Sequence, residues 1–310
     1  LADYGGNIFE RQGSIYDIYG EMIREGDLDP EAVSGIRGEK VTFDEQRQQY
    51  VANCAGYPAV NADGRISVIG RLVLDGDISN LEEGIRSQVD LEINGNVGFT
   101  AISVAGDVSV NGNLRECSVF CAGNLNVDGD ILSCREPGIE VLGNISCLTI
   151  LSCKVLCRGK LEFERSLLNC EVAADGGINS REGALSGGHI ECCGDIRVGR
   201  IGDSDGTPTE IEITISPYHK AQMMKLTKEV IKLKQDSQGN SEAIAALESR
   251  IRECENNMDS ELNSFLARPP EERIRLLVQQ DAFPPVQIRI LKHEYRIRNH
   301  QVHLELIEKD

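Results

Sequence analysis

Residues 101–125 read AISVAGDVSVNGNLRECSVFCAGNL, and in this stretch a glycine followed by Asn or Asp and an aliphatic residue occurs three times. The unit recurs along the middle of the chain. One register of it is marked by glycines at intervals of 17, 20, 16, 17 and 18 residues: Gly106, Gly123, Gly143, Gly159, Gly176 and Gly194. A repeat this short cannot enclose a hydrophobic core alone, so its copies must stack as the coils of a solenoid.

Hydrophobic residues alternate with period two on both sides of these glycines. Around Gly143 they are Ile139, Val141, Ile145 and Cys147, and the same positions are mostly apolar at the other five glycines. Such alternation places the four side chains on one face of a strand–turn–strand unit. We therefore expect inward ladders of a parallel β-helix over residues 61–216. The glycines would occupy corners where positive φ is needed and a side chain would obstruct the turn.

The longest interval between these glycines contains the turn-rich segment Cys134-Arg135-Glu136-Pro137-Gly138. We expect this segment to bulge outward from the stack.

The chain has 11 cysteines, and several of them fall on the expected ladders. Cys121, Cys157 and Cys192 share one inward position. No Cys-x2-Cys pair occurs, and no histidine lies near the pairs Cys117/Cys121 and Cys153/Cys157, so core-filling thiols are favoured over metal ligands or disulfides. We expect no cofactor and no metal. Many free thiols predict a reducing, cytoplasmic setting.

The formal net charge of −18 is confined to the first part of the chain. Residues 217–310 carry 15 basic and 15 acidic residues, whereas residues 1–216 carry 17 basic and 35 acidic ones. This balance argues against binding to nucleic acid or to anionic membrane surfaces, which need clustered Lys and Arg. No segment approaches the roughly 18–20 apolar residues of a membrane span, so no direct membrane insertion is expected.

The organisation before and after the repeats is different. Residues 1–60 form an N-terminal mixed or β region, with strand-like patterns near residues 40–43 and 50–52 and weak helical spacing from Ile15 to Ile23.

Residues 217–267 change to heptad spacing interrupted by a polar turn, which predicts an antiparallel coiled-coil hairpin. The expected seam includes Leu226, Val230, Leu233, Leu247 and Ile251.

The last segment, residues 268–310, is expected to return to the solenoid. A short helix reaching about Gln280 should be followed by a three-stranded meander built around Val286–Ile290, Tyr295–Ile297 and Val302–Leu306. These strands would cap the last coil. The fold class predicted is an all-β solenoid with an α-helical insertion.

The order of these parts resembles the flagellar assembly protein A (FapA) family of bacteria. The resemblance rests on the stretch from Ile66 to Ile78, on Gly183–His189, and on Phe283-Pro284-Pro285-Val286 after the hairpin. It implies a right-handed β-helix with a cytoplasmic, non-catalytic role linked to flagellar assembly. The many cysteines, the short hairpin and Pro285, where the family usually has Gly, depart from the family pattern.

Signals for catalysis are weak. The serines lack a Gly-x-Ser-x-Gly setting. His189 follows a Gly-Gly turn and could act as a single base in an acyltransferase. Asp203–Gly206 with Glu210 lacks the ligand spacing of a calcium loop.

The leading hypothesis is a non-enzymatic cytoplasmic scaffold, linked to flagellar assembly or cell-surface morphogenesis. Its hairpin would bind a protein partner or a second copy of the chain, giving a homo-oligomer. One alternative is a polymerising or division-regulating β-helix of the bactofilin or septum-inhibitor kind. Another is a β-helix enzyme acting on polysaccharide or on an acyl donor.

Overall fold

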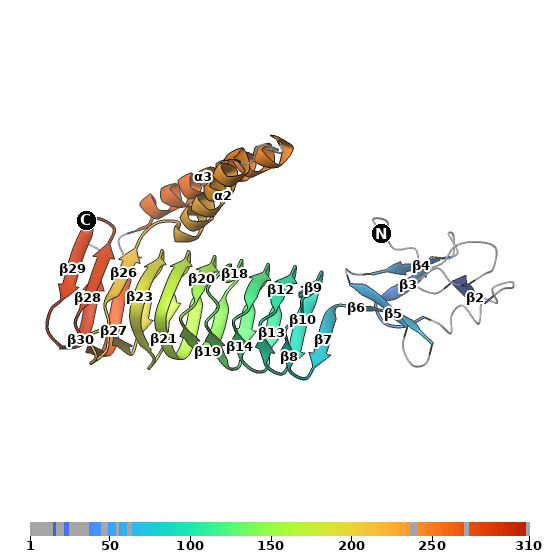
Figure 1. Ribbon diagram of the computed structural model, residues 1–310, viewed down its shortest axis with the longest axis horizontal. Coiled ribbons are helices and arrows are strands. Elements are labelled where there is room, and N and C mark those ends of the chain that lie inside the picture. The colour runs from blue at the N-terminus through green and yellow to red at the C-terminus, as the bar shows by residue number, and fades with distance from the viewer. Residues whose placement is uncertain are drawn as a thin grey trace. The chain divides into compact units, whose positions relative to one another are not determined.

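The computed structural model describes residues 37–44, 49–53, 56–60, 64–235, 241–269 and 273–307, with two short strands before them, β1 (Ile15–Tyr16) and β2 (Met22–Arg24) (Figure 1). The chain divides into two compact units. One comprises residues 1–73 and 87–91, and the other residues 74–86 and 92–310. The division falls within β7 (Arg71–Asp75), β9 (Ile85–Ser87) and β10 (Asp90–Asn94).

The first unit consists of short antiparallel pairs. β1 pairs with β2, β3 (Val41–Asp44) with β4 (Gln49–Ala52), and β5 (Tyr57–Val60) with β6 (Ile66–Ile69). Val41, Tyr50, Ile66 and Val68 form its small buried core. The strands expected near residues 40–43 and 50–52 are confirmed. A helix through Ile15 and Met22 is wrong, because both residues lie in paired strands.

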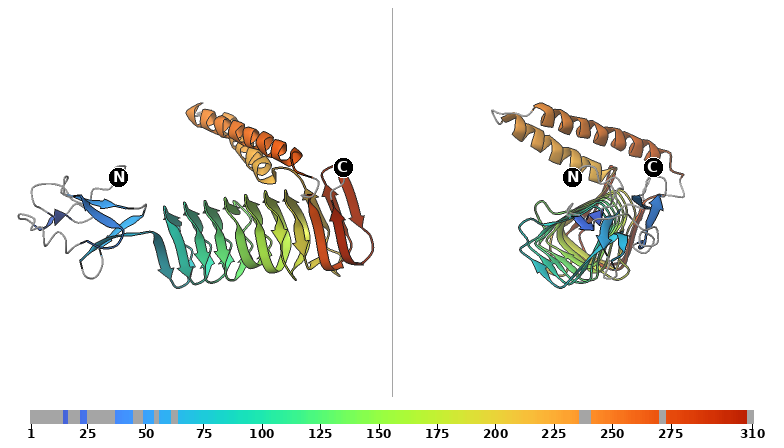
Figure 2. Two further views of the ribbon diagram at one scale, coloured as in Figure 1. Left: turned by 180° about the vertical axis from the view of Figure 1, so that it is seen from behind. Right: turned by 90° about the vertical axis from the view of Figure 1, so that its right-hand side faces the viewer.

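The second unit is a parallel β-solenoid whose coils wind around a common axis (Figures 1 and 2). Its strands form three rows, and each full coil contributes one strand to each row. The first row contains β9, β12 (Ala101–Val104), β15 (Ser118–Cys121), β18 (Ile139–Val141), β20 (Lys154–Cys157), the ends of β21 (Leu161–Ala174) and β23 (Ala184–Cys192), β26 (Thr209–Ile213) and β28 (Val286–Ile290).

The other two rows follow the same order. The second row contains β10, β13 (Val108–Val110), β16 (Leu125–Val127), the starts of β19 (Ile145–Leu151) and β21, β22 (Ile178–Asn179), β24 (Ile196–Val198) and the start of β27 (Arg275–Ala282). The third row contains β8 (Ile78–Ser79), β11 (Val97–Gly98), β14 (Leu114–Arg115), β17 (Asp130–Leu132), the end of β19, the middle of β21, the start of β23, β25 (Arg200–Ile201) and the end of β27.

The predicted ladders are confirmed by the pairing register. Ile145 pairs with Leu161, Leu161 with Ile178, and Ile178 with Ile196, and all four side chains are completely buried. Burying an aliphatic side chain of this size stabilises the fold by about 1.5–3 kcal/mol. Because each inward side chain is covered by the same position of the next coil, the stacked coils together form the hydrophobic core.

Of the two reasons predicted for the repeated glycines, the positive φ is wrong and the exclusion of a side chain is confirmed. None of Gly123, Gly143 and Gly159 has a positive φ. Instead, the N–H of Gly143 donates to the carbonyl of Gly123 at 2.9 Å, and a Cβ on Gly143 would lie 2.5 Å from that oxygen. The stacking of corner on corner therefore excludes a side chain, even though the backbone conformation would accept one.

The Asn or Asp after each glycine joins consecutive coils. The Oδ1 atom of Asp107 accepts the N–H of Asn124 at 2.7 Å, and Oδ1 of Asn124 accepts the N–H of Asn144 at 2.9 Å. Oδ1 of Asn144 in turn accepts the N–H of Lys160 at 2.8 Å. Each side chain thus satisfies a backbone donor of the next coil.

Cysteines on successive coils also form a ladder. The N–H of Cys117 donates to Sγ of Cys134, and the N–H of Cys134 to Sγ of Cys153, both at 3.3 Å. Cys170 continues the ladder, and its thiol donates to the carbonyl of Leu168 at 3.1 Å. Cys134 is therefore buried, and Gly138 is buried as well, so the predicted outward bulge is wrong at both of its ends. Only residues 135–137 are exposed.

The helical insertion lies between β26 and β27. It consists of α2 (Pro217–Gln235) and α3 (Ser241–Leu266). The helices run antiparallel, because His219 lies beside Asn257 near one end and Lys234 pairs with Glu248 near the other. We call them the helical pair.

The return segment differs from the prediction in two ways. The helix expected to reach Gln280 is the strand β27, because Leu276 and Val278 are buried against Ile196 and Val198 in the second row. The three strands expected after it are confirmed, but they do not form a meander. β28 pairs antiparallel with β29 (His293–Ile297), but β30 (Gln301–Ile307) pairs antiparallel with β27. The last coil thus ends in two antiparallel strand pairs.

Candidate functional site at the base of the helical pair

The helical pair starts from a fixed point on the solenoid. After β26 the chain turns at Ser216, which is buried and has a φ of 53°. Pro217 is the first residue of α2, a position that tolerates proline because no helical hydrogen bond is lost there. The Oδ1 atom of Asp175, on an earlier coil, accepts the N–H of Tyr218 at 2.8 Å.

One outward row of side chains receives α2. Glu140, Leu156, Ala173 and Glu191 pair in this order on successive coils. We call these four residues the docking row. Its apolar centre is covered by Tyr218, which packs against Leu156 and Ala173 and is itself buried.

Charged residues close both ends of the docking row. Glu140 accepts hydrogen bonds from the hydroxyl of Tyr218 at 3.3 Å and from the amide of Gln222, and its other oxygen lies 3.1 Å from Nζ of Lys225. At the other end, Glu191 lies 3.1 Å from Nζ of Lys220.

The pKa values of two side chains in this contact are shifted. Burial raises the pKa of the Tyr218 hydroxyl, and the negative charge of Glu140 adds to the effect. Burial alone would raise the pKa of Glu191, but His189 and Lys220 outweigh it and lower the pKa below its ordinary value. Glu191 is therefore ionised in this contact at neutral pH.

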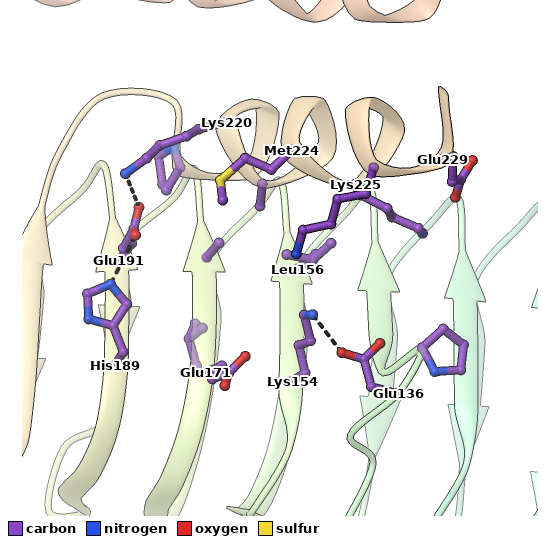
Figure 3. Close-up of a pocket in the computed structure, with 16 residues that line it drawn as sticks. Glu136, Lys154, Leu156, Glu171, His189, Glu191, Lys220, Met224, Lys225 and Glu229 are labelled. Carbon is purple, nitrogen blue, oxygen red and sulfur yellow. Dashed lines mark hydrogen bonds and ion pairs between the residues drawn. The ribbon is translucent and has the colours of Figure 1, made fainter. Parts of the chain in front are cut away.

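A groove of about 740 Å³ lies between α2 and the solenoid (Figure 3). Lys154 pairs with Glu136 at 2.9 Å across its floor, and Nε2 of His189 lies 3.0 Å from Glu191. Among the described residues that line the groove, none is a serine or a cysteine. His189 therefore has no serine or cysteine beside it on this lining, and its Nδ1 atom lies 3.3 Å from Glu210, so both of its ring nitrogens face carboxylates.

A second group of polar side chains lies at the base of the helical pair. Nδ1 of His219 is 3.4 Å from Oδ2 of Asp175 and 3.3 Å from Oε1 of Glu261. The hydroxyl of Ser216 donates to Oε2 of Glu261, and Nδ2 of Asn257 lies 3.4 Å from Nε2 of His219. We call Asp175, Ser216, His219, Asn257 and Glu261 the junction cluster.

Burial governs the ionisation of the junction cluster. Desolvation raises the pKa of Asp175 to about 7, although the hydrogen bond from Tyr218 opposes it. Desolvation also lowers the pKa of His219, against the raising effect of Glu261. Both shifts favour the uncharged forms of two groups that lie in contact.

The interaction residues predicted from the sequence lie outside the docking row and the junction cluster. Of the expected seam, Leu226 and Val230 are buried, and Leu233, Leu247 and Ile251 are half-buried in the helical pair. The repeat glycines lie at the stacked corners, and the three inward cysteines are buried inside the solenoid: Gly106, Gly123, Gly143, Gly159, Gly176, Gly194, Cys121, Cys157 and Cys192.

The junction cluster was not predicted, although one signal for it exists in the sequence. Asp175 directly precedes a repeat glycine, at the position that Ala105, Ala122 and Leu142 occupy in earlier coils. Arg158 of the coil directly before it is charged as well, so the carboxylate is only a weak indication of a role outside the stack. Nothing comparable marks His219 or Glu261, which reach Asp175 only through the docking of the helices.

Comparisons with known proteins show which family the sequence matches. Within the described residues, no helix is sufficiently long and apolar to cross a bilayer. The sequence has no significant match among curated proteins or among solved structures. The family model described as the Flagellar Assembly Protein A beta solenoid domain matches residues 72–310. The chain, with its stacked glycine corners and inserted helical pair, therefore belongs to the FapA family.

Proposed function

We propose that this chain is a non-enzymatic, cytoplasmic scaffold of flagellar assembly, in which the solenoid holds the helical pair for a protein partner. Membership of the FapA family supports the flagellar part of the proposal. Both ring nitrogens of His189 face carboxylates, Glu191 at 3.0 Å and Glu210 at 3.3 Å, and Lys154 pairs with Glu136 across the groove; these pairings favour binding over catalysis.

One observation carries the scaffold role. Of the 26 residues of α3, only Phe265 is buried. α2 packs against β20 and β21 of the solenoid, whereas α3 packs mainly against α2. The side of α3 that faces away from α2 is therefore left for another protein.

The composition of α3 indicates the chemistry of the partner. The helix has six acidic and two basic residues, and Leu262 and Leu266 are exposed near its end. A partner surface with basic side chains around an apolar patch would complement it. Self-association through the same helix remains part of the proposal, because the inner seam of the pair covers only one side of α3.

The test combines a gene deletion with a surface variant in the native organism. Leu262→Glu with Leu266→Glu would alter the exposed end of α3 without touching the solenoid, and Glu162→Ala, an exposed position on β21, serves as the matched control. We expect the deletion to reduce flagellation, the α3 variant to reproduce that defect, and the control to behave as wild type.

The two parts of the proposal fail separately. Normal flagella in the deletion strain would contradict the flagellar role. Defective flagella in the deletion strain, but normal flagella with the α3 variant, would contradict the role of the helix. Light scattering of the purified variant and wild type then shows whether α3 joins copies of the chain.

A further inference from the structure

We propose that Asp175, His219 and Glu261 form a binding site for a divalent transition-metal ion, with zinc as its representative, at the joint between the solenoid and the helical pair. The proposal rests on the junction cluster alone. This ligand set includes none of the cysteines considered from the sequence.

The spacing of the three ligand atoms fits a small ion. Zinc binds imidazole nitrogen and carboxylate oxygen at about 2.0–2.1 Å, usually with tetrahedral geometry. Two ligands at that distance and at the tetrahedral angle lie about 3.3–3.4 Å apart. Nδ1 of His219 lies 3.4 Å from Oδ2 of Asp175 and 3.3 Å from Oε1 of Glu261. The ligand atoms of Asp175 and Glu261 lie within 4.8 Å of one another, so the two carboxylates would close around an ion that His219 already faces at the right spacing.

The burial of these atoms provides a second, independent argument. Nδ1 of His219 and Oδ2 of Asp175 are both inaccessible, and neither forms a hydrogen bond. The side chain of His219 is 4% exposed and that of Asp175 is 10% exposed. A buried polar atom without a partner costs about 1–3 kcal/mol, and a buried charge costs more. A cation bound to both atoms removes this cost.

The surrounding groups would orient the ligands. The N–H of Tyr218 holds the other oxygen of Asp175, and Ser216 holds the other oxygen of Glu261. The amide of Asn257 faces Nε2 of His219. If Oδ1 of that amide is turned to the ring, it accepts the Nε2 proton and leaves the lone pair of Nδ1 for the metal. Such outer contacts are typical of histidines that bind metals.

The three ligands come from three different segments. Asp175 belongs to a coil corner of the solenoid, His219 to α2 and Glu261 to α3. One ion would therefore connect both helices to the stack. Its role would be structural, fixing the direction in which the helical pair leaves the solenoid.

A similar group of residues on the surface provides the matched control. His189, Glu191 and Glu212 also place their ligand atoms close together. There, however, Glu191 pairs with Lys220 and Glu212 with Arg289. Protein cations already neutralise those carboxylates, so we expect no ion to bind among them.

The experiment titrates Zn²⁺ into the full chain after treatment with a chelator, using calorimetry. We expect one ion per chain. Asp175→Asn keeps an oxygen for the N–H of Tyr218, and Glu261→Gln keeps one for Ser216, so both variants should fold, which circular dichroism checks. Loss of a contact outside the first coordination sphere lowers metal affinity about 10–100-fold, so we expect losses of more than about 100-fold for these ligands. His189→Gln should bind as wild type.

Substitution of Co²⁺ identifies the donor atoms. A nitrogen and oxygen ligand set gives visible d–d bands without a thiolate charge-transfer band. A strong thiolate band would show binding to cysteines and would overturn the proposal. So would the absence of one-to-one binding in the wild type, or binding unchanged in both folded variants.

Discussion

The carboxylate of Glu140 accepts a hydrogen bond at 3.3 Å from the hydroxyl of Tyr218, a residue 78 positions further along the chain. Gln222 and Lys225 bind the same carboxylate. The side chain of Glu140 thus contacts three residues on one face of α2, which are spaced by four and three positions along the helix. The orientation of α2 along the stack depends on this contact and on the packing of Tyr218.

Replacing Glu140 with alanine should loosen the helical pair while leaving the solenoid folded. The change removes the acceptor for Tyr218, Gln222 and Lys225, and hydrogen bonds to charged groups contribute about 1.5–3 kcal/mol. Hydrogen exchange of the amides in the first turns of α2 should become at least about tenfold faster. Glu162→Ala, on another face of the solenoid, is the control. Unchanged exchange in the Glu140 variant would show that Tyr218 packing alone holds the helix.

Gly143→Ala should destabilise the solenoid through its stacked corner. The new Cβ would lie 2.5 Å from the carbonyl oxygen of Gly123, so that the two coils must move apart. We expect a loss of about 1–3 kcal/mol in the free energy of unfolding, measured by denaturant titration. Gly98→Ala provides the control, because its Cβ would meet no atom closer than 3.8 Å. Equal stability of the two variants would contradict the stacking explanation for the repeat glycines.

The ladder cysteines should resist alkylation in the native protein. Burial raises the pKa of the thiols of Cys147 and Cys157 to about 12 and that of Cys170 to about 11, and the thiolate is the reactive form. Cys254 on α3 is only half-buried. Among the cysteines that the structure describes, mass spectrometry after iodoacetamide treatment should therefore find Cys254 modified first. The remaining nine should react after unfolding, and rapid native labelling of Cys157 would contradict the interior position.

Asp203 should stabilise the last coils in a pH-dependent way. Its carboxylate accepts hydrogen bonds from the hydroxyl of Ser186 at 2.5 Å and from the N–H of Thr207 at 3.0 Å, and these bonds lower its pKa to about 2. A lowered pKa in the folded state means that the contribution is present above the ordinary pKa of about 3.9. It is lost as the pH falls from there through 2.

The corresponding measurement follows thermal unfolding of Asp203→Asn and wild type across that pH range. The variant should be less stable near neutral pH, and the difference should shrink toward pH 2. Asp205→Asn, an exposed neighbour, should match wild type throughout. A difference that stays constant with pH would show that the charge of Asp203 is not responsible.

The sequence predicted the repeating part of the molecule residue by residue. Ile145, Leu161, Ile178 and Ile196 stack as their spacing indicated, because an inward position in one coil is covered by the same position in the next. Local information suffices where every neighbour is a copy of the same unit. It also located the helical pair, since the change from period two to heptad spacing is itself a local signal.

The sequence was less informative where one segment meets a different one. Residues 275–282 have an ambiguous local pattern, and they form a strand because the second row of the last coil offers them a partner in β24. The same holds for the glycines. Their identity was evident from the repeat, but the reason for it, the approach of Gly143 to Gly123, exists only when two coils are stacked.

The sequence by itself therefore determined the coils, their register and the presence of two helices. Tertiary structure alone decided where those helices attach and which polar groups they bury. Asp175, His219 and Glu261 are separated by more than forty residues at each step, and no periodicity relates them. They meet because Tyr218 covers the apolar centre of the docking row. That contact brings the ends of the two helices against the solenoid corner that carries Asp175.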